Sequence, residues 1–229
     1  MPRRARLVIP EIPLHITQRG VNRCAVFLDS DDRAHYLSLL SSVSKDHGVD
    51  IHAYVLMGNH VHLLLTPRAT GSVSAVMRRL SQCYVQAFNR KYGRTGTLWE
   101  GRFKSCLVDT EAYLLTVYRY IELNPVRAAL ADAPERYFWS SAQGNLGIRM
   151  DHVLTPHPVF LALSAESAKR AEIYASLLKQ GTGPDDLAAI RAYLEQEKAL
   201  GSSRFQAMVE RTLGKVSTWR PRGRPPQDS

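Results

Sequence analysis

The chain has 229 residues, 45% of them hydrophobic, and its 30 Lys and Arg against 21 Asp and Glu give a formal net charge of +9. This length can bury a substantial core, and no apolar run reaches the ~20 residues that a membrane-spanning helix needs. The basic N-terminus lacks the apolar segment of a signal peptide, and three widely spaced cysteines do not fit a disulfide framework. We therefore expect a cytoplasmic protein with no membrane partner, whose positive charge favours nucleic acid.

The first half of the chain alternates predicted strands and helices. Apolar and β-branched patterning predicts strands over residues 14–19, 24–28, 51–65 and 96–109, the last with a bend at Gly101. N-cap residues, apolar periodicity and glycine stops predict helices over about 30–47, 72–92 and 112–123. This order predicts an α+β fold in which one antiparallel sheet is covered on one face by helices.

The predicted strand over 51–65 contains the sequence Asn59-His60-Val61-His62. Because side chains alternate along a strand, His60 and His62 point to the same face, roughly 7 Å apart at their Cα atoms. Two imidazoles on one face of a rigid strand form half of a site for a divalent metal ion. The alternative interpretation is that both histidines are hydrogen-bonded polar residues on a half-exposed strand.

The helix predicted over 112–123 brings a second chemical signal. Tyr120 and Asn124 are four residues apart, so their side chains can reach one shared point on the flank of the helix. A phenol beside a carboxamide could attack a phosphorus atom while the amide oxygen helps to hold a metal ion. Two structural alternatives stay open: a flank tyrosine often only packs, and Asn124 before Pro125 suits the N-cap of a following helix.

A basic and aromatic window lies between Arg78 and Lys104, where seven basic residues accompany one acid, Glu100. Cations beside exposed aromatic rings suit single-stranded nucleic acid, because the charges hold phosphates and the rings stack on unpaired bases. Tyr84 and Phe88 have helical spacing and are expected to face a core. Trp99 and Phe103, which flank Glu100-Gly101-Arg102, are the better candidates for ligand contact.

The last third of the chain is rich in Ala, Leu and Glu. It predicts three helices, over about 160–179, 185–200 and 202–213. The predicted organisation is a main domain over 1–150, a helical extension over 151–215 and a basic, disordered tail over 216–229. Arg222 and Arg224, in the tail sequence Arg-Gly-Arg-Pro, could lie in an A·T-rich minor groove or simply contact phosphates.

Four motifs in register resemble the single-tyrosine HUH transposases, and most closely the branch of REP-associated tyrosine transposases. The resemblance covers roughly residues 10–145, and the matching segments are 14–23, 53–62, 98–105 and 120–127. It implies a ferredoxin-like or RRM-like α+β core. It also implies that His60, His62 and Asn124 bind Mg²⁺ or Mn²⁺ and that Tyr120 is the nucleophile, with Tyr113 as the fallback.

The resemblance further implies a substrate of single-stranded DNA with a small hairpin of the REP type. The candidate DNA contacts are Arg19, Asn22, Arg23, Trp99, Arg102 and Lys104, with Arg222 and Arg224 in the tail. Members of this branch can act as monomers, so a monomer is favoured over a homodimer.

Three functions compete on the sequence. The first is a metal-dependent DNA nickase and strand transferase, and the second is a domesticated protein that binds its hairpin without cutting. The third is an RRM-like RNA-binding module, which would need paired aromatic residues on adjacent strands. His60, His62, Tyr120 and Asn124 together favour the enzyme.

Overall fold

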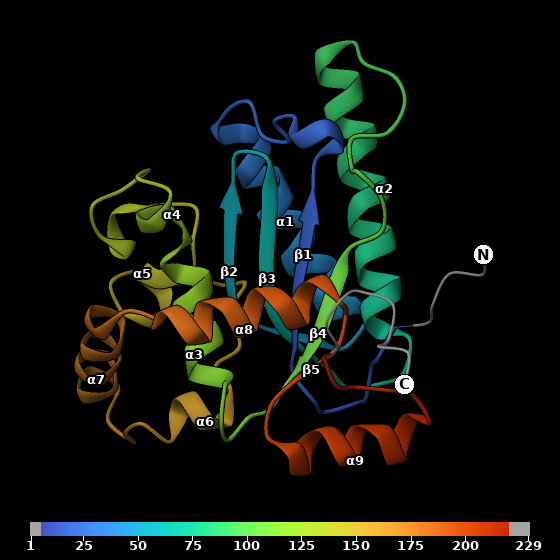
Figure 1. Cartoon of the computed structure of the whole chain (residues 1–229). Coiled ribbons are helices and arrows are strands. Elements are labelled where there is room, and N and C mark those ends of the chain that lie inside the picture. The colour runs from blue at the N-terminus through green and yellow to red at the C-terminus, as the bar shows by residue number, and fades with distance from the viewer. Residues whose placement is uncertain (1–5, 220–229) are drawn as a thin grey trace.

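A mixed five-stranded sheet forms the centre of the computed structural model, which describes residues 6–219 (Figure 1). The strand order is β2-β3-β1-β4-β5; the first four strands are antiparallel to their neighbours, and β5 runs parallel to β4. The strands are β1 (Leu14–Arg19), β2 (Val49–Met57), β3 (His60–Pro67), β4 (Lys104–Val108) and β5 (Ala199–Leu200). The predicted α+β class is confirmed.

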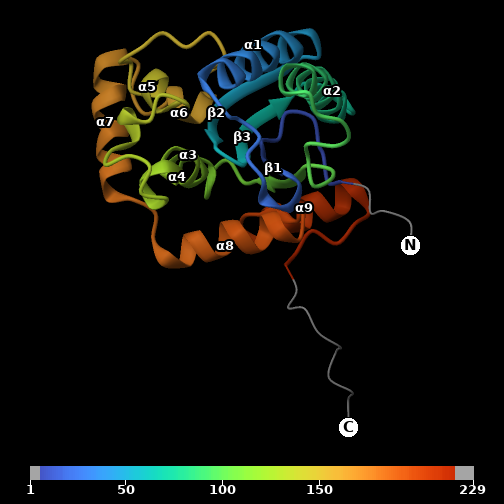
Figure 2. The same ribbon diagram turned by 90° about the horizontal axis from the view of Figure 1, so that it is seen from above.

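Helices cover both faces of this sheet, so the prediction of cover on one face only was wrong. Figure 2 shows α1 and α2 on one side of the strands and α3 and α8 on the other. The α-helices are α1 (Ser30–Asp46), α2 (Ser72–Tyr92), α3 (Leu114–Glu122), α4 (Asn124–Arg127), α5 (Ala142–Asn145), α6 (Pro158–Leu161), α7 (Ser167–Gln180), α8 (Pro184–Glu195) and α9 (Ser203–Leu213), and the 3₁₀ turns are η1 (Val21–Arg23) and η2 (Pro134–Arg136).

Local capping chemistry sets the ends of the two long helices where the sequence predicts them. At the start of α1 the Asp29 carboxylate accepts from the Asp32 backbone N–H, and the Asp32 side chain accepts in return from the Asp29 backbone. Helix α2 ends at Tyr92, and its C-cap residue Gly93 has a φ of 61°, a left-handed conformation that glycine adopts without steric cost.

The run over 51–65 is a hairpin and not the single strand that the sequence predicts. Strand β2 ends at Met57, Gly58 and Asn59 form the turn, and β3 begins at His60. A single strand of that length would extend about 50 Å, well beyond the usual strand in a compact domain. The segment predicted as a strand over 24–28 follows the η1 turn as irregular chain, and β4 is shorter than predicted.

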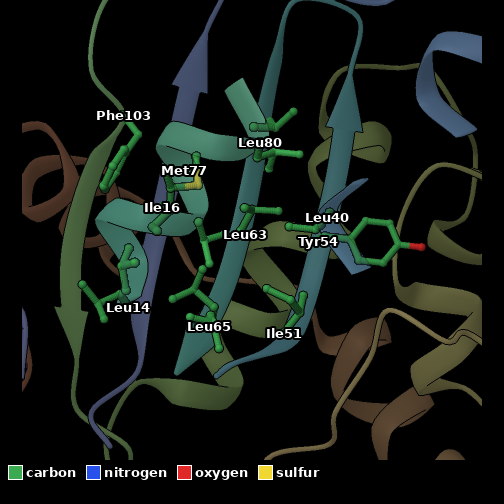
Figure 3. Close-up of a cluster of buried hydrophobic side chains, with 14 of the residues drawn as sticks. Leu14, Ile16, Leu40, Ile51, Tyr54, Leu63, Leu65, Met77, Leu80 and Phe103 are labelled. Carbon is green, nitrogen blue, oxygen red and sulfur yellow. The ribbon is translucent and has the colours of Figure 1, made fainter. Parts of the chain in front are cut away.

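The face under α1 and α2 carries the larger hydrophobic core, part of which Figure 3 shows. Leu14 and Ile16 of β1 project to this face together with Leu63 and Leu65 of β3, and Met77 of α2 packs on them. All five are at most 1% exposed. This core packs one face of the sheet, and the alternate side chains of β1 and β3 point to the opposite face.

The opposite face has its own core, in which α3 lies against β2 and β3. At its centre the Glu122 carboxylate, fully buried, accepts hydrogen bonds from Ser141 Oγ at 2.5 Å, Tyr174 Oη at 2.6 Å and Asn145 Nδ2 at 2.7 Å. Burial raises the pKa of Glu122, and the three donors oppose that rise. This network ties α3 to α5 and α7.

The C-terminal segment joins the same sheet and core. The predicted helix over 185–200 is wrong at its end, because α8 stops at Glu195 and Ala199 and Leu200 form β5, opposite Leu107 and Val108. Leu194 and Leu200 are buried in the core beneath α3. Within residues 6–219, no helix is both long enough and apolar enough to cross a membrane.

We expect Glu122→Ala to lower the free energy of unfolding by about 3 kcal/mol, because three buried donors lose their common acceptor. Chemical denaturation would measure the change. The matched control is Glu111→Ala, since Glu111 is exposed at the turn before α3 and its loss should change stability by less than about 0.5 kcal/mol. Equal stabilities of the two variants would contradict a structural role for the network.

Candidate active site

The register of β1 against β3 sets the position of the two predicted histidines. Arg19 lies opposite His60 and Thr17 opposite His62, while Thr17 is also paired with Lys104 of β4. Because these residues alternate with the buried leucines, they share the face of the sheet that α3 covers. The ring centroids of His60 and His62 are 5.2 Å apart, so both imidazoles can contact one ligand.

Hydrogen bonds orient both imidazoles. His60 Nδ1 lies 2.7 Å from Asn59 Oδ1, so it donates to that oxygen and leaves Nε2 with its lone pair. His62 Nδ1 lies 2.8 Å from Nε2 of the fully buried His15, and one of these two nitrogens donates to the other. His15, which the sequence argument did not single out, is therefore a partner that positions His62.

Burial keeps this histidine cluster uncharged. Desolvation lowers the pKa of His15 to about 3, and desolvation followed by the charge of Arg19 lowers the pKa of His60 to about 4. The pKa of His62 is also well below its ordinary value, first through burial and then through its neighbour His15. At neutral pH all three rings are neutral, and the neutral imidazole is the form that binds metal ions.

Helix α3 brings Tyr120 to the same place. Its buried stripe of Leu114, Val117, Tyr118 and Ile121 packs on the sheet. The Tyr120 ring then lies 5.7 Å from His62 and 5.5 Å from His15, measured between centroids. Tyr120 is only 5% exposed, and no other residue within 6–219 hydrogen-bonds to its hydroxyl.

Asn124 and Arg127 act on the backbone and ring of Tyr120. Asn124 Nδ2 donates to the Tyr120 carbonyl at 3.0 Å, and Asn124 makes no side-chain cap at the start of α4, so the capping alternative is wrong. Arg127 donates to the same carbonyl and holds its guanidinium 4.7 Å from the centroid of the Tyr120 ring. The sequence argument missed Arg127, although its position seven residues after Tyr120 places both on one helical face.

His60, His62, Tyr120 and Asn124 meet at a cavity of about 620 Å³, whereas His15 and Arg127 support these residues from outside its lining. Seven of the sequence-predicted site residues line it: Arg19, His60, His62, Arg102, Lys104, Tyr120 and Asn124. The far wall comes from α8, which contributes Arg191, Leu194 and Glu195, none of which the sequence argument singled out. Lys104 Nζ forms an ion pair with Glu195 at 2.5 Å, so β4 and α8 meet across the cavity.

Residues 9–124, just over half of the chain, match the family model described as "Transposase IS200 like". The chain belongs to this family. A solved structure of a REP-associated tyrosine transposase bound to a REP hairpin is similar to the transposase described here, with 18% identity, a TM-score of 0.55 and coverage of 69% of this chain and 93% of that one. A putative transposase from Deinococcus radiodurans R1 gives 22% identity, a TM-score of 0.38 and coverage of 53% and 96%. No curated protein matches the chain.

The structure does not bring every predicted contact of the transposase to the cavity. Trp99 is 5% exposed and packs against Tyr36 and Tyr84, so its prediction as an exposed base-stacking residue was wrong. The basic residues around Trp99 in the sequence suggested an exposed side chain, although the indole ring belongs to the hydrophobic core. Asn22 and Arg23 are exposed on the η1 turn, and neither they nor Tyr113 line the cavity. Arg222 and Arg224 lie outside the described residues.

The donor set of the transposase fits a divalent ion that completes its coordination with substrate and water. Within residues 6–219 no group of three or more His, Cys, Asp or Glu side chains could hold a metal ion. Among the residues that line the cavity, two imidazole nitrogens, from His60 and His62, and the side-chain oxygen of Asn124 fit such an ion, since the amide nitrogen of Asn124 already donates to the Tyr120 carbonyl. Phosphate oxygens would supply the hard ligands that Mg²⁺ and Mn²⁺ prefer.

A close backbone approach explains one glycine of the first motif. A Cβ atom at Gly20 would lie 2.3 Å from the Cys24 carbonyl oxygen, whereas one at Gly101, on the cavity rim, would have no neighbour within 4 Å. Gly20 thus lets the chain turn sharply after β1, and Asn59 Nδ2 fixes the turn by donating to the Arg23 carbonyl at 3.1 Å.

We expect Gly20→Ala to destabilise the transposase by about 2 kcal/mol, because the new methyl group meets backbone that cannot move away cheaply. Gly101→Ala is the matched control and should leave the melting temperature within about 1 °C of the wild type. Differential scanning calorimetry of the two variants measures the contrast. A Gly20→Ala protein as stable as Gly101→Ala would rule out the steric explanation.

Proposed function

We propose that this transposase cuts and rejoins single-stranded DNA through a covalent 5′-phosphotyrosine on Tyr120, with Mg²⁺ or Mn²⁺ as its metal ion. One observation supports the proposal above the others: Tyr120 of α3, His60 and His62 of β3, and Asn124 of α4 line a single cavity. A core tyrosine has no need of two histidines and an amide around it. This convergence therefore favours the catalytic interpretation over purely structural roles.

The proposed substrate is a DNA hairpin of the REP type with single-stranded flanks. Two facts support it: the solved structure with 18% identity holds a REP hairpin, and the cavity here is lined by the cations Arg19, Arg102 and Lys104. Cations at a cavity wall hold phosphates in register without reading the bases. Tyr120 and both histidines of the same chain reach this cavity, so a second copy is not needed to bring the nucleophile to the histidines, and we propose that the protein acts as a monomer.

In the proposed reaction the Tyr120 oxygen attacks a backbone phosphorus in line with the bond to the 3′ oxygen. The new bond joins the phenol oxygen to the 5′-phosphate, the P–O3′ bond breaks, and the leaving 3′ oxygen takes up a proton to become a hydroxyl. A second 3′-hydroxyl reverses the step on a different strand and releases the phenol. The phosphodiester energy is kept in the phosphotyrosine, so no nucleotide triphosphate is needed.

The surrounding residues would position the nucleophile and the phosphate. Arg127, which covers one face of the Tyr120 ring and bonds its carbonyl, would restrict the orientation of the phenol. Water in the cavity would accept the phenol proton. His60, His62 and the Asn124 oxygen would hold the metal ion, which when bound would neutralise charge that develops on the phosphate oxygens.

Tyr120→Phe should abolish the covalent protein–DNA adduct and leave hairpin affinity within about twofold of the wild type, because only the attacking oxygen is removed. The adduct is detected on a denaturing gel after incubation with labelled hairpin DNA and Mg²⁺ or Mn²⁺. Tyr113→Phe, at the N-cap of the same helix, is the matched control and should keep full activity. An adduct that survives in Tyr120→Phe and vanishes in Tyr113→Phe would move the nucleophile to Tyr113. A DNA complex on a native gel with no adduct under either metal would favour the binding-only protein.

The double variant His60→Ala, His62→Ala should abolish Mn²⁺ binding, because it removes both imidazoles that line the cavity in the described part of the chain. Isothermal titration calorimetry measures this binding directly and does not depend on DNA cleavage. The exposed His35 on α1 provides the control, and His35→Ala should bind Mn²⁺ as the wild type does. A chelator should also stop adduct formation. Wild-type Mn²⁺ affinity in the double variant would place the metal site elsewhere.

A further inference from the structure

Helix α8 forms part of the cavity although it lies beyond residues 9–124, the part of the chain that matches the family model. Figure 1 shows α8 crossing in front of the strands on the side where α3 lies. Its residues Arg191, Leu194 and Glu195 face the same space as His60, His62 and Tyr120. The wall opposite the strands is therefore supplied by the C-terminal extension.

The position of α8 is held by packing and not by surface charge alone. Ile190 and Leu194 are 0% and 6% exposed in the core that also contains Tyr120. Immediately after the helix, β5 pairs in parallel with β4, the strand that begins with Lys104. These two attachments hold the exposed side of α8 in place above the cavity.

The two basic side chains at this wall, Lys104 and Arg191, differ in whether they have an ion-pair partner. Lys104 is already matched by Glu195, at 2.5 Å, whereas Arg191 has no ion-pair or hydrogen-bond partner within residues 6–219. Arg191 is exposed, and its guanidinium is close enough to Arg127 to contribute, after desolvation, to the lowered pKa of that residue. Two like charges held near each other beside a cavity are stabilised when an anion enters between or beside them.

We propose that Arg191 is a DNA phosphate contact of the active site, supplied by the C-terminal extension, and that it holds the backbone of the strand lying against Tyr120. This rests on the proposed function, because the anion is taken to be single-stranded DNA. Guanidinium suits the task since it presents several donors in a plane to phosphate oxygens and keeps its charge at any working pH. The extension is thus part of the DNA-binding surface.

The experiment compares Arg191→Gln with the wild type for binding to a labelled single-stranded oligonucleotide that contains a hairpin, across a series of NaCl concentrations. The matched control is Arg211→Gln, which removes the same charge from the exposed surface of α9, away from the cavity. We expect Arg191→Gln to raise Kd roughly threefold to tenfold and to flatten the plot of log Kd against log salt by about 0.7, the value for one phosphate contact on a single strand. Arg211→Gln should match the wild type in both measurements.

An Arg191→Gln protein with the wild-type Kd and salt slope overturns the proposal for Arg191, and wild-type adduct formation in the same preparation shows that the proposed function itself stands. Equal losses in Arg191→Gln and Arg211→Gln also overturn it, because they show a diffuse effect of net charge. A wild-type protein that binds no single-stranded DNA at any salt concentration overturns both the proposed function and the role of Arg191.

Discussion

The central position of β1, hydrogen-bonded to β3 on one side and to β4 on the other, is the constraint on which the site depends. Its register places Thr17 beside His62 and Lys104 at once, so residues that are far apart in sequence share one row across the sheet. A shift by one residue would exchange every side chain between the two faces and bury the histidines among the leucines. The core under α1 and α2 makes such a shift costly, because Leu14 and Leu63 would then face the cavity.

Burial sets the charge state of the histidines in this row and limits the orientation of Tyr120. His15 and His62 share a hydrogen bond at 2.8 Å that would be lost only if both rings were charged, and desolvation keeps both neutral at physiological pH. Tyr120 is enclosed by rings and by Arg127, so its phenol has few orientations to choose from. A preorganised site of this kind spends little free energy on ordering its own groups when a strand enters.

Local patterns predicted the parts of the site that depend on local periodicity. Residue spacing predicted, without knowledge of the fold, that His60 and His62 share one face of a strand. It likewise predicted that Tyr120 and Asn124 share one face of a helix, because strand and helix periods are properties of the backbone. The hairpin at Gly58 was missed because apolar residues continue on both sides of the turn and hide it. The two-residue strand β5 was beyond reach, since its pairing with β4 is non-local and leaves no periodic signal.

The same argument explains why Arg191 could not be found from the sequence. It belongs to an ordinary amphipathic helix and reaches the cavity only because Leu194 is buried beside Tyr120 and because Leu200 continues the sheet. Removing the extension would therefore do more than delete one charge: it would expose the edge of β4 and the apolar side of α3 to water. For that reason single substitutions on the exposed side of the extension, and not its truncation, test whether it contributes to DNA binding as proposed.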